Sequence, residues 1–153
     1  MSKLFIMAGR RGSSCLFCSM VNGTETYSLV HETESVLALM DIQPVNPGHV
    51  LVVSKTHATY LAELAPELGG EIFRVGMLVA AGLRRSGVRC EGVNLFLADG
   101  AAAGQEVFHV HLHVFPRFEH DGFGLRFGPD NRKRPGRTEL DRIAARLRDS
   151  IAK

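Results

Sequence analysis

The stretch QEVFHVHLHVFPR, residues 105–117, places His109, His111 and His113 at alternate positions. Successive side chains on a strand point to opposite faces, so this alternation predicts a strand whose three histidines share one face. Alternate α-carbons on such a face lie roughly 6.5–7 Å apart. Pro116 lacks an N–H and is expected to end the strand. The other face is expected to pack on a helix through Phe108, Val110, Leu112 and Val114.

Three imidazoles on one strand face favour a chemical role over a solvated surface, because ordinary surface positions carry Lys, Glu or Thr. Two chemistries fit these residue types. Neighbouring histidines can ligate zinc, and a histidine can serve as nucleophile or acid–base at a phosphoryl or acyl centre. The residues by themselves leave both interpretations open.

The segment GQEVFHVHLHVFPR, residues 104–117, resembles the signature of the histidine triad (HIT) superfamily of nucleotidyl hydrolases and transferases. That signature is His-apolar-His-apolar-His-apolar-apolar, preceded by Gly-Gln. Three more segments agree in order: CLFC at 15–18, MDIQPVNPGHV at 40–50 and VVSKTH at 52–57. Over residues 15–117 the chain therefore resembles a bacterial-type HIT family protein.

Length and composition bound the remaining possibilities. The 153 residues suffice for one domain with a single core. A hydrophobic content of 45%, a charged content of 22% and a net charge of +2 indicate an ordinary soluble protein and not a nucleic-acid binder. No apolar run reaches the length of a membrane span, so no membrane partner is expected. Three cysteines do not fit a disulfide framework, and cytoplasmic location is predicted.

The domain organisation is expected to have three parts. Residues 1–14 are predicted to be a flexible leader, and residues 15–117 to form the HIT domain. Residues 118–153 are predicted to form a long loop and a helix packed on the same domain. The basic cluster Arg132, Lys133 and Arg134 is typical of a solvated patch, with contact to a phosphorylated ligand as the less favoured alternative.

Before the histidine segment, hydrophobic patterning predicts four strands, at 25–31, 35–41, 49–55 and 93–98. A long helix is expected over 66–86, starting at a proline. Its apolar face is predicted from residues at helical spacing: Leu68, Ile72, Val75, Leu78, Val79 and Leu83.

A final helix is expected from Thr138 to near residue 152. Its apolar face is Leu140, Ile143, Ala144 and Leu147. These elements predict an α+β fold, an antiparallel meander with helices on one face. The HIT resemblance implies five antiparallel strands and a homodimer that continues the sheet across the long helix and the edge strands.

The resemblance also implies roles for the three histidines. The middle histidine, His111, would attack the α-phosphorus of a nucleotide and form a nucleotidyl-histidine that water then hydrolyses. His113 would donate a hydrogen bond to a phosphoryl oxygen. The carbonyl of His109 would hold the second ring nitrogen of His111 and so fix its tautomer.

Substrate contacts follow from the same resemblance. Asp41 would accept hydrogen bonds from the ribose hydroxyls of a purine nucleotide, and Ile42 would border the base pocket. His49 would lie near the triad, while Gln105 and Glu106 would line the approach. The plain alternatives are a turn aspartate for Asp41 and a hydrogen-bonded strand-start residue for His49. Dinucleoside polyphosphates and nucleoside phosphoramidates remain equally open as substrates.

One position departs from the pattern. Many relatives carry Asn or Gln where this chain has Ala98, and that side chain contacts phosphate or leaving group. The neighbouring Asp99 is a poor substitute, because a carboxylate repels phosphate. Two alternatives therefore stay open: a nucleotide-binding protein with little catalysis, and a metal-dependent hydrolase that uses the triad histidines as ligands.

Cys15 and Cys18 have the Cys-x-x-Cys spacing of two ligands to one zinc or of a redox pair. The resemblance adds His57 and His109 as the third and fourth ligands. Two sulfurs and two nitrogens would close a tetrahedral, structural zinc site. The alternative is four unrelated residues. Cys90 is far from the pair in sequence and is expected to be structural.

Overall fold

The computed structural model describes residues 15–132 and 134–152 of the chain. The leader expected over 1–14 lies outside the described residues. Two compact units are present, the first ending at Asp121 and the second beginning at Gly122. In the described part of the chain, no helix has the length and apolar character needed to cross a membrane.

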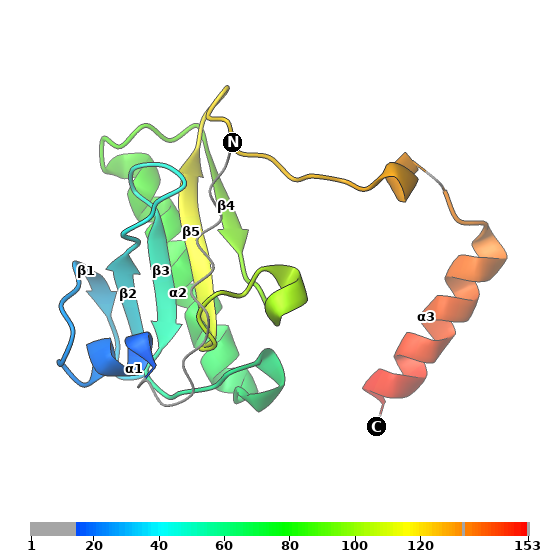
Figure 1. Ribbon diagram of the computed structural model, residues 1–153, viewed down its shortest axis with the longest axis horizontal. Coiled ribbons are helices and arrows are strands. Elements are labelled where there is room, and N and C mark those ends of the chain that lie inside the picture. Colours follow the sequence, from blue (N-terminus) through cyan, green and yellow to red (C-terminus); the bar gives the residue numbers. More distant parts are fainter. Residues whose placement is uncertain (1–14, 133, 153) are drawn as a thin grey trace. The chain divides into compact units, whose positions relative to one another are not determined.

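The first unit contains a five-stranded antiparallel sheet and two α-helices, which confirms the α+β class (Figure 1). The strands are β1 (Leu29–Glu32), β2 (Val36–Met40), β3 (Val50–Ser54), β4 (Gly92–Phe96) and β5 (His111–Arg117). The helices are α1 (Leu16–Val21) and α2 (Pro66–Arg85), with short 3₁₀ turns at Leu61–Glu63 and Ala101–Ala103.

The strand order is β1-β2-β3-β5-β4, so the expected simple meander is wrong in one respect. β5 inserts between β3 and β4 and pairs antiparallel with both. β3 and β4 therefore run parallel to each other, and a parallel connection needs a crossover element. The long helix α2 supplies that crossover, which leaves β4 at one edge of the sheet and the histidine strand inside it.

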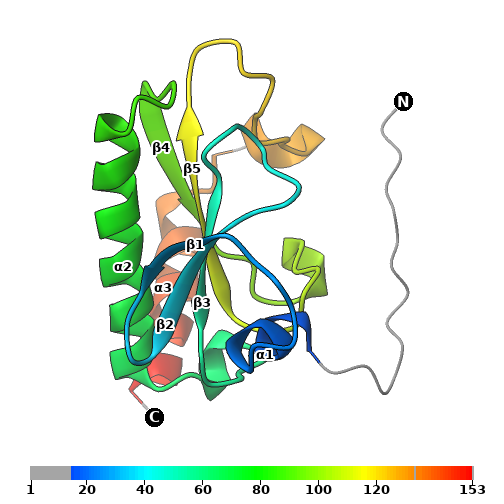
Figure 2. The same ribbon diagram turned by 90° about the vertical axis from the view of Figure 1, so that its left-hand side faces the viewer.

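The two faces of the sheet are covered by different helices, as Figure 2 shows. α2 packs on one face through Ile72, Val75, Val79 and Leu83. Phe17 and Met20 of α1 pack on the other face, against Leu37, Leu39, Leu51 and Val53. The expectation that helices lie on one face only is therefore wrong, because a six-residue helix is too short to show a helical period in the sequence.

α2 matches its predicted range to within one residue. Leu78 is wrong as a core residue, since it is 49% exposed. Gly76 lies on the buried side, where an added Cβ would come within 2.7 Å of Leu112 Cδ2. The absence of a side chain at Gly76 therefore lets the helix approach the histidine strand closely.

The histidine strand differs from its prediction at both ends. It begins at His111, so His109 precedes it, and Phe108 is 44% exposed instead of buried with Val110. Pro116 lies within the strand instead of ending it. β3 pairs with β5 only as far as Val114, and β4 alone pairs with β5 beyond that residue. Pro116 lacks an N–H, but β3 has no residue opposite it, so no hydrogen bond to β3 is missing.

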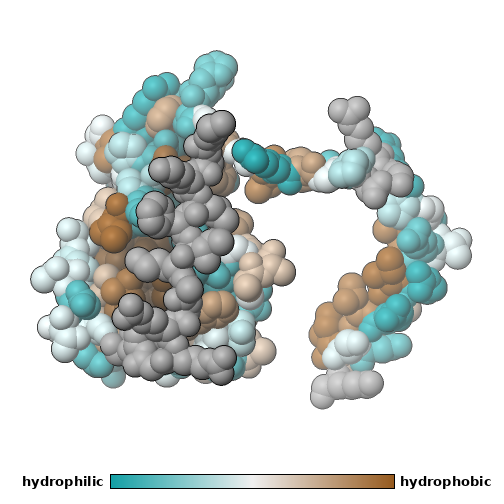
Figure 3. Space-filling view, viewed as in Figure 1, coloured by the Kyte–Doolittle hydropathy of each residue, from teal (hydrophilic) through white to brown (hydrophobic). Residues whose placement is uncertain are grey.

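Smaller differences occur elsewhere. β1 begins at Leu29 and not at residue 25, because the N–H groups of Thr24 and Glu25 donate to Ser19 O beside α1. In the second unit, α3 (Arg137–Ile151) follows a 3₁₀ turn at Pro129–Arg132, and Gly136 occupies the N-cap expected for Thr138. Apolar side chains line one side of α3 (Figure 3). Its packing on the first unit stays a prediction.

Candidate active site

His111 opens β5 with only one ring nitrogen free. Its Nδ1 lies 2.7 Å from the carbonyl oxygen of His109, so Nδ1 carries the proton and donates. In the neutral ring Nε2 then holds an unshared electron pair. The side chain is only 6% exposed and its ring packs edge-on against Phe17, with centroids 5.1 Å apart. The position is thus more enclosed than a solvent-facing strand residue.

His113 is paired with His49, which comes from the loop before β3. The backbone N–H of Val45 lies 3.1 Å from His49 Nδ1, and a backbone N–H always donates, so this nitrogen must accept. In the neutral ring the proton then sits on His49 Nε2, which lies 3.0 Å from His113 Nδ1. His113 Nδ1 must accept in turn, and its own proton sits on Nε2. The backbone therefore assigns both tautomers.

The histidines of the site are held neutral. Burial is the main cause, and it lowers the pKa of His49, His109 and His111 below the ordinary 6.5. The hydrogen bond from His111 to the His109 carbonyl opposes that shift without cancelling it. Burial, followed by repulsion from His111 and His49, lowers the pKa of His113 to about 4. At neutral pH the site therefore offers one imidazole with a free electron pair beside one with a free N–H.

Unfolding should depend on pH through His113. Between pH 6.5 and about 4 the unfolded chain binds this proton and the folded chain does not, so the free energy of unfolding falls as pH is lowered. One pKa unit is worth about 1.4 kcal/mol, so the contribution is at most roughly 3 kcal/mol across this window. Thermal unfolding of the wild type and His113→Gln at pH 7 and pH 4.5 measures it. Equal losses in both proteins on acidification would contradict the assignment.

Asp41 lies directly after β2, within reach of the paired histidines. Its Oδ1 accepts the N–H of Gln43 at 2.8 Å. Its Oδ2 lies 3.4 Å from His49 Nδ1, but that nitrogen accepts from Val45 and the lowered pKa keeps the ring neutral, so the contact is not an ion pair. The carboxylate retains acceptor capacity for a ligand hydroxyl.

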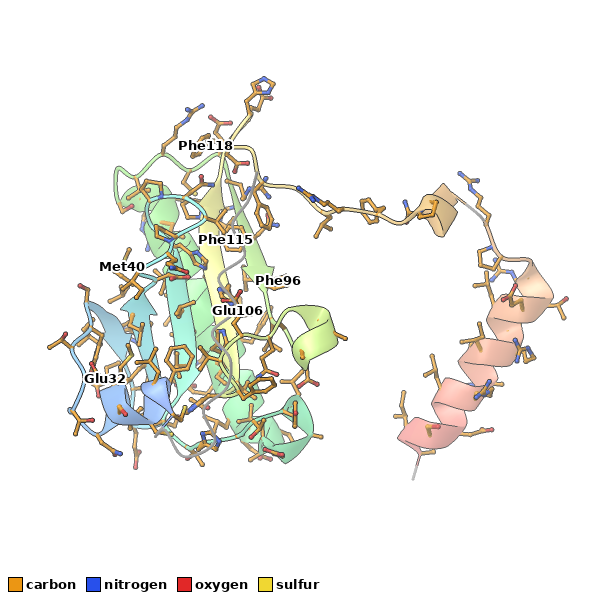
Figure 4. All side chains as sticks on the ribbon, in the orientation of Figure 1. Glu32, Met40, Phe96, Glu106, Phe115 and Phe118 are labelled. Atoms are coloured by element: carbon orange, nitrogen blue, oxygen red, sulfur yellow. The ribbon has the colours of Figure 1, made fainter. Side chains whose placement is uncertain are left out.

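The other expected contact residues have mixed positions. Ile42 is 88% exposed, and its place beside the base stays a prediction. Glu106 is exposed. Phe96, which the sequence did not mark as a site residue, lies on the edge strand with its ring centroid 6.0 Å from that of His113 (Figure 4). Ala98 is buried. Asp99 Oδ1 accepts the N–H of Leu61 at 3.0 Å, so this carboxylate holds a turn.

Gln105 is buried and its amide is fully used by the backbone. Oε1 accepts the N–H of Gly100 at 2.8 Å, while Nε2 donates to the carbonyls of Thr59 and Val107 at 2.8 and 3.3 Å. The side chain therefore ties the segment around His57 to the loop before the histidine strand. A substrate contact of Gln105 stays a prediction.

The four expected metal ligands converge, although Cys15 and His109 are 94 residues apart in the chain. The nitrogen His109 Nδ1 lies 3.3 Å from Cys15 Sγ, 3.7 Å from Cys18 Sγ and 3.2 Å from His57 Nδ1, and Cys18 Sγ lies 3.4 Å from His57 Nδ1. Around a tetrahedral zinc ion, S···N and N···N edges of about 3.5 and 3.3 Å are expected from its bond lengths. The spacing fits a closed tetrahedral site.

His109 is also oriented as a ligand. Its Nε2 lies 2.8 Å from the carbonyl oxygen of Ser54, so Nε2 carries the proton and Nδ1 faces the cysteines with its electron pair. Such a hydrogen bond on the far nitrogen is the usual support of a metal-bound histidine. The triad is thus divided, since His109 turns to the cysteines while His113 turns to His49. Among the described residues, no candidate metal cluster contains all three histidines.

Four contributors were not expected from the sequence: Phe17, Val45, Ser54 and Phe96. Val45 acts through its backbone N–H, and Ser54 acts through its carbonyl oxygen and through its hydroxyl, which lies 3.2 Å from His109 Nε2. No residue pattern marks these contacts. Phe17 sits between the cysteines of CLFC, and only that placement beside two ligands could have drawn attention to it.

The fold and the site together define an α+β protein whose antiparallel sheet carries neutral histidines beside a cysteine–histidine cluster. Comparison with known proteins gives the family. Residues 22–120 match the model of the HIT domain, and the chain belongs to the HIT family, whose superfamily comprises nucleotide-binding proteins and hydrolases.

Similar proteins span most of the chain. An uncharacterized HIT-like protein of Borreliella burgdorferi is 39% identical over 115 residues, which are 74% of this chain and 83% of that protein. A HIT family protein of Bacillus anthracis has 38% identity and a TM-score of 0.79, with 89% of this chain and 96% of that chain covered. A zinc-bound histidine triad protein of Mycobacterium smegmatis has 37% identity and a TM-score of 0.70, covering 92% and 98%.

Proposed function

We propose that this protein is a nucleotide hydrolase or nucleotidyl transferase that acts at the α-phosphate through a nucleotidyl-histidine intermediate. The observation that carries the proposal is the hydrogen bond from His111 Nδ1 to the His109 carbonyl, which leaves Nε2 free to attack. A relative from Arabidopsis thaliana, 32% identical over 110 residues that make up 55% of its length, is named an adenylylsulfatase. That name supports an adenylyl-type substrate.

The proposed reaction has two displacement steps. In the first, His111 Nε2 attacks the α-phosphorus, an N–P bond forms, and the bond to the leaving group breaks. The N–H at His113 Nε2 donates to a phosphoryl oxygen and stabilises the charge that develops there. In the second, water attacks phosphorus and releases one proton to the solvent, and the N–P bond breaks, which returns the electron pair to Nε2. Dividing one difficult displacement into two easier ones lowers the barrier.

Asp41 is the proposed contact of the ribose of a purine nucleotide, with Ile42 beside the base and Gln105 and Glu106 along the approach. A carboxylate accepts well from two vicinal hydroxyls, and Asp41 keeps acceptor capacity beyond its bond to Gln43. Asp41→Asn is expected to raise KM for the nucleotide several-fold with a smaller change in kcat. The rise in KM should be smaller for a substrate that lacks the 2′-hydroxyl. An equal rise in KM for both substrates would contradict the assignment of Asp41 to the ribose.

The reaction is tested with a panel of adenosine and guanosine phosphoramidates, dinucleoside polyphosphates and adenylyl sulfate. Turnover of at least one compound, together with a phosphorus-labelled adduct that maps to His111, is expected. Binding of every nucleotide without turnover would favour the alternative of a nucleotide-binding protein, which the alanine at position 98 allows. Turnover that stops on chelation and returns with added metal would favour a metal-dependent hydrolase.

Zinc is the proposed occupant of the cysteine–histidine cluster. The two thiolates and two imidazole nitrogens match its preferred donors, and a closed set of four leaves no position for substrate, so the ion would be structural. Cys15, Cys18, His57 and His109 would hold the ion, and its charge would keep both thiols ionised when it is bound. Reduced thiols at Cys15 and Cys18 are in keeping with a cytoplasmic location.

A homodimer is proposed at the edge formed by α2 and β4. Apolar side chains there are exposed in the single chain, namely Phe73, Met77, Leu78 and Phe96. A hollow beside them is lined by Ala80, Ala81 and Leu95 as well as by Arg84 and Arg85. An apolar surface of this kind on a helix favours burial against another protein surface.

Met77→Glu is expected to convert the dimer to a monomer at micromolar concentration, because the substitution would bury an unpaired carboxylate in the interface. Sedimentation velocity measures the change. Leu29→Glu, which introduces the same charge at an exposed apolar residue of β1, is the control and should leave the dimer intact. A wild-type protein that sediments as a monomer would contradict the proposal.

A further inference from the structure

The loop between β2 and β3 folds back around His49. The N–H of Val45 reaches His49 Nδ1 at 3.1 Å, and the N–H of His49 donates to the carbonyl of Asn46 at 3.1 Å. The N–H of Asp41 donates to the carbonyl of His49 at 3.0 Å. The position of one loop N–H therefore decides which nitrogen of His49 can carry a proton.

Asn46 anchors this loop to the far end of the histidine strand. The residue is 5% exposed, and its Nδ2 donates to the carbonyl of Pro116 and to Asp121 Oδ2, both at 2.9 Å. Both amide protons are thus used. Phe115 and Phe118, labelled in Figure 4, mark this end of the strand. The carbonyl of Pro116 faces the side where β3 has ended, so Asn46 takes the place of a strand partner.

The carboxylate of Asp121, which accepts from Asn46, is also held by an arginine. Its side chain is 2% exposed, and Arg117 binds both carboxylate oxygens, with Nε at 2.6 Å from Oδ2 and Nη2 at 2.9 Å from Oδ1. A paired guanidinium–carboxylate contact of this kind is rigid as well as strong. The anchor therefore joins the loop at Asn46 to a fixed point beyond the strand.

Two tautomer pairs compete at His49 and His113. With the Val45 N–H in place, His49 holds its proton on Nε2 and His113 presents an N–H at Nε2. Without that N–H, His49 Nδ1 can carry the proton and donate to Asp41 Oδ2, which is 3.4 Å away. His49 Nε2 then accepts, His113 donates from Nδ1, and its Nε2 has no proton to offer a phosphoryl oxygen.

We propose that Asn46 and Asp121 are positioning residues for the reaction, because they hold the loop whose Val45 N–H selects the tautomers of His49 and His113. The inference rests on the proposed function for its effect on turnover. Its effect on the histidines is independent of substrate. Neither residue belongs to the histidine segment, and they lie 75 positions apart.

The test is nitrogen NMR of protein with ¹⁵N-labelled histidine at neutral pH, combined with kinetics. In the wild type, His49 and His113 should both be protonated at Nε2. In Asn46→Ala a population protonated at Nδ1 should appear in both rings, and kcat should fall by about tenfold or more with KM changed by less than about twofold. Val45→Pro removes the donor itself and should shift the tautomers further, which keeps the test decisive if Asn46→Ala fails to fold.

Thr33→Ala is the matched control. Its hydroxyl accepts the N–H of Val36 at 3.1 Å and braces the turn between β1 and β2, so its loss should lower stability without moving either tautomer. Unchanged tautomers in both Asn46→Ala and Val45→Pro would overturn the proposal, whatever happens to activity. Shifted tautomers with unchanged kcat would also overturn it. If the wild type turns over no substrate, the proposed function is wrong. The NMR result still tests whether Asn46 and Asp121 set the tautomers of His49 and His113.

Discussion

His111→Asn is expected to lower kcat by at least about a thousandfold, because it removes the nitrogen that forms the covalent bond. Nδ2 of the new asparagine can still donate to the carbonyl of His109, which now receives His111 Nδ1 at 2.7 Å. The fold should therefore be kept. Single-turnover assays with labelled nucleotide measure both the rate and the adduct, and the adduct should disappear with the turnover.

His31→Asn is the control for this substitution. His31 is an exposed histidine of β1, so the same chemical change there should leave turnover unaffected. The nucleophile assignment would be wrong if His111→Asn kept near wild-type turnover, or if the labelled nucleotide mapped to another residue. Retained circular dichroism and melting temperature in both variants would separate loss of chemistry from loss of fold.

Cys15→Ser combined with Cys18→Ser is expected to abolish binding of about one zinc ion per chain and to lower the melting temperature by about 10 °C, equivalent to about 3 kcal/mol. The loss follows from the geometry, since both sulfurs lie within 3.7 Å of His109 Nδ1. Without the ion, only the packing of Phe17 and Met20 would hold α1 on the sheet. Elemental analysis and differential scanning calorimetry measure the two effects.

Cys90→Ser provides the matched control for the zinc experiment. Cys90 is the third cysteine, and its Sγ donates to the carbonyl of Gly92 at 3.2 Å, away from the cluster. This variant should keep its zinc. Protein that is free of metal as isolated and equally stable after chelation would rule out the structural site. The double variant should also lose part of its kcat, because His109 supplies the carbonyl that orients His111.

Much of the fold was predictable from local pattern. Alternation along the histidine segment placed His111 and His113 on one face and Val110, Leu112 and Val114 on the other, because the strand period is two. Helical spacing gave α2 nearly to its ends. The pattern failed at Phe108 and Pro116, where the limits of the strand depend on how far its neighbours extend and not on the residues themselves.

The candidate site was likewise predictable only in part. The resemblance assigned the expected nucleophile, the ribose contact and the metal ligands to residues of this sequence, and it marked Ala98 as a departure from the family pattern. The sequence could not show that the Gln105 amide forms its hydrogen bonds with backbone groups. It also could not show that the Asp99 carboxylate accepts the N–H of Leu61. Hydrogen bonds between distant segments leave no period in the sequence.

The sequence alone determined which residue types stand together on the histidine strand, since neighbours two apart must share a face. Only the tertiary structure decided which groups each imidazole contacts and which of its nitrogens carries the proton. His109 turns to cysteines 91 and 94 positions away, and His113 meets His49 across 64 positions. The proton of each ring is then placed by a partner on its other nitrogen, the Ser54 carbonyl for His109 and the Val45 N–H acting through His49 for His113. Backbone groups exist at every residue, so only the fold can select the ones that act.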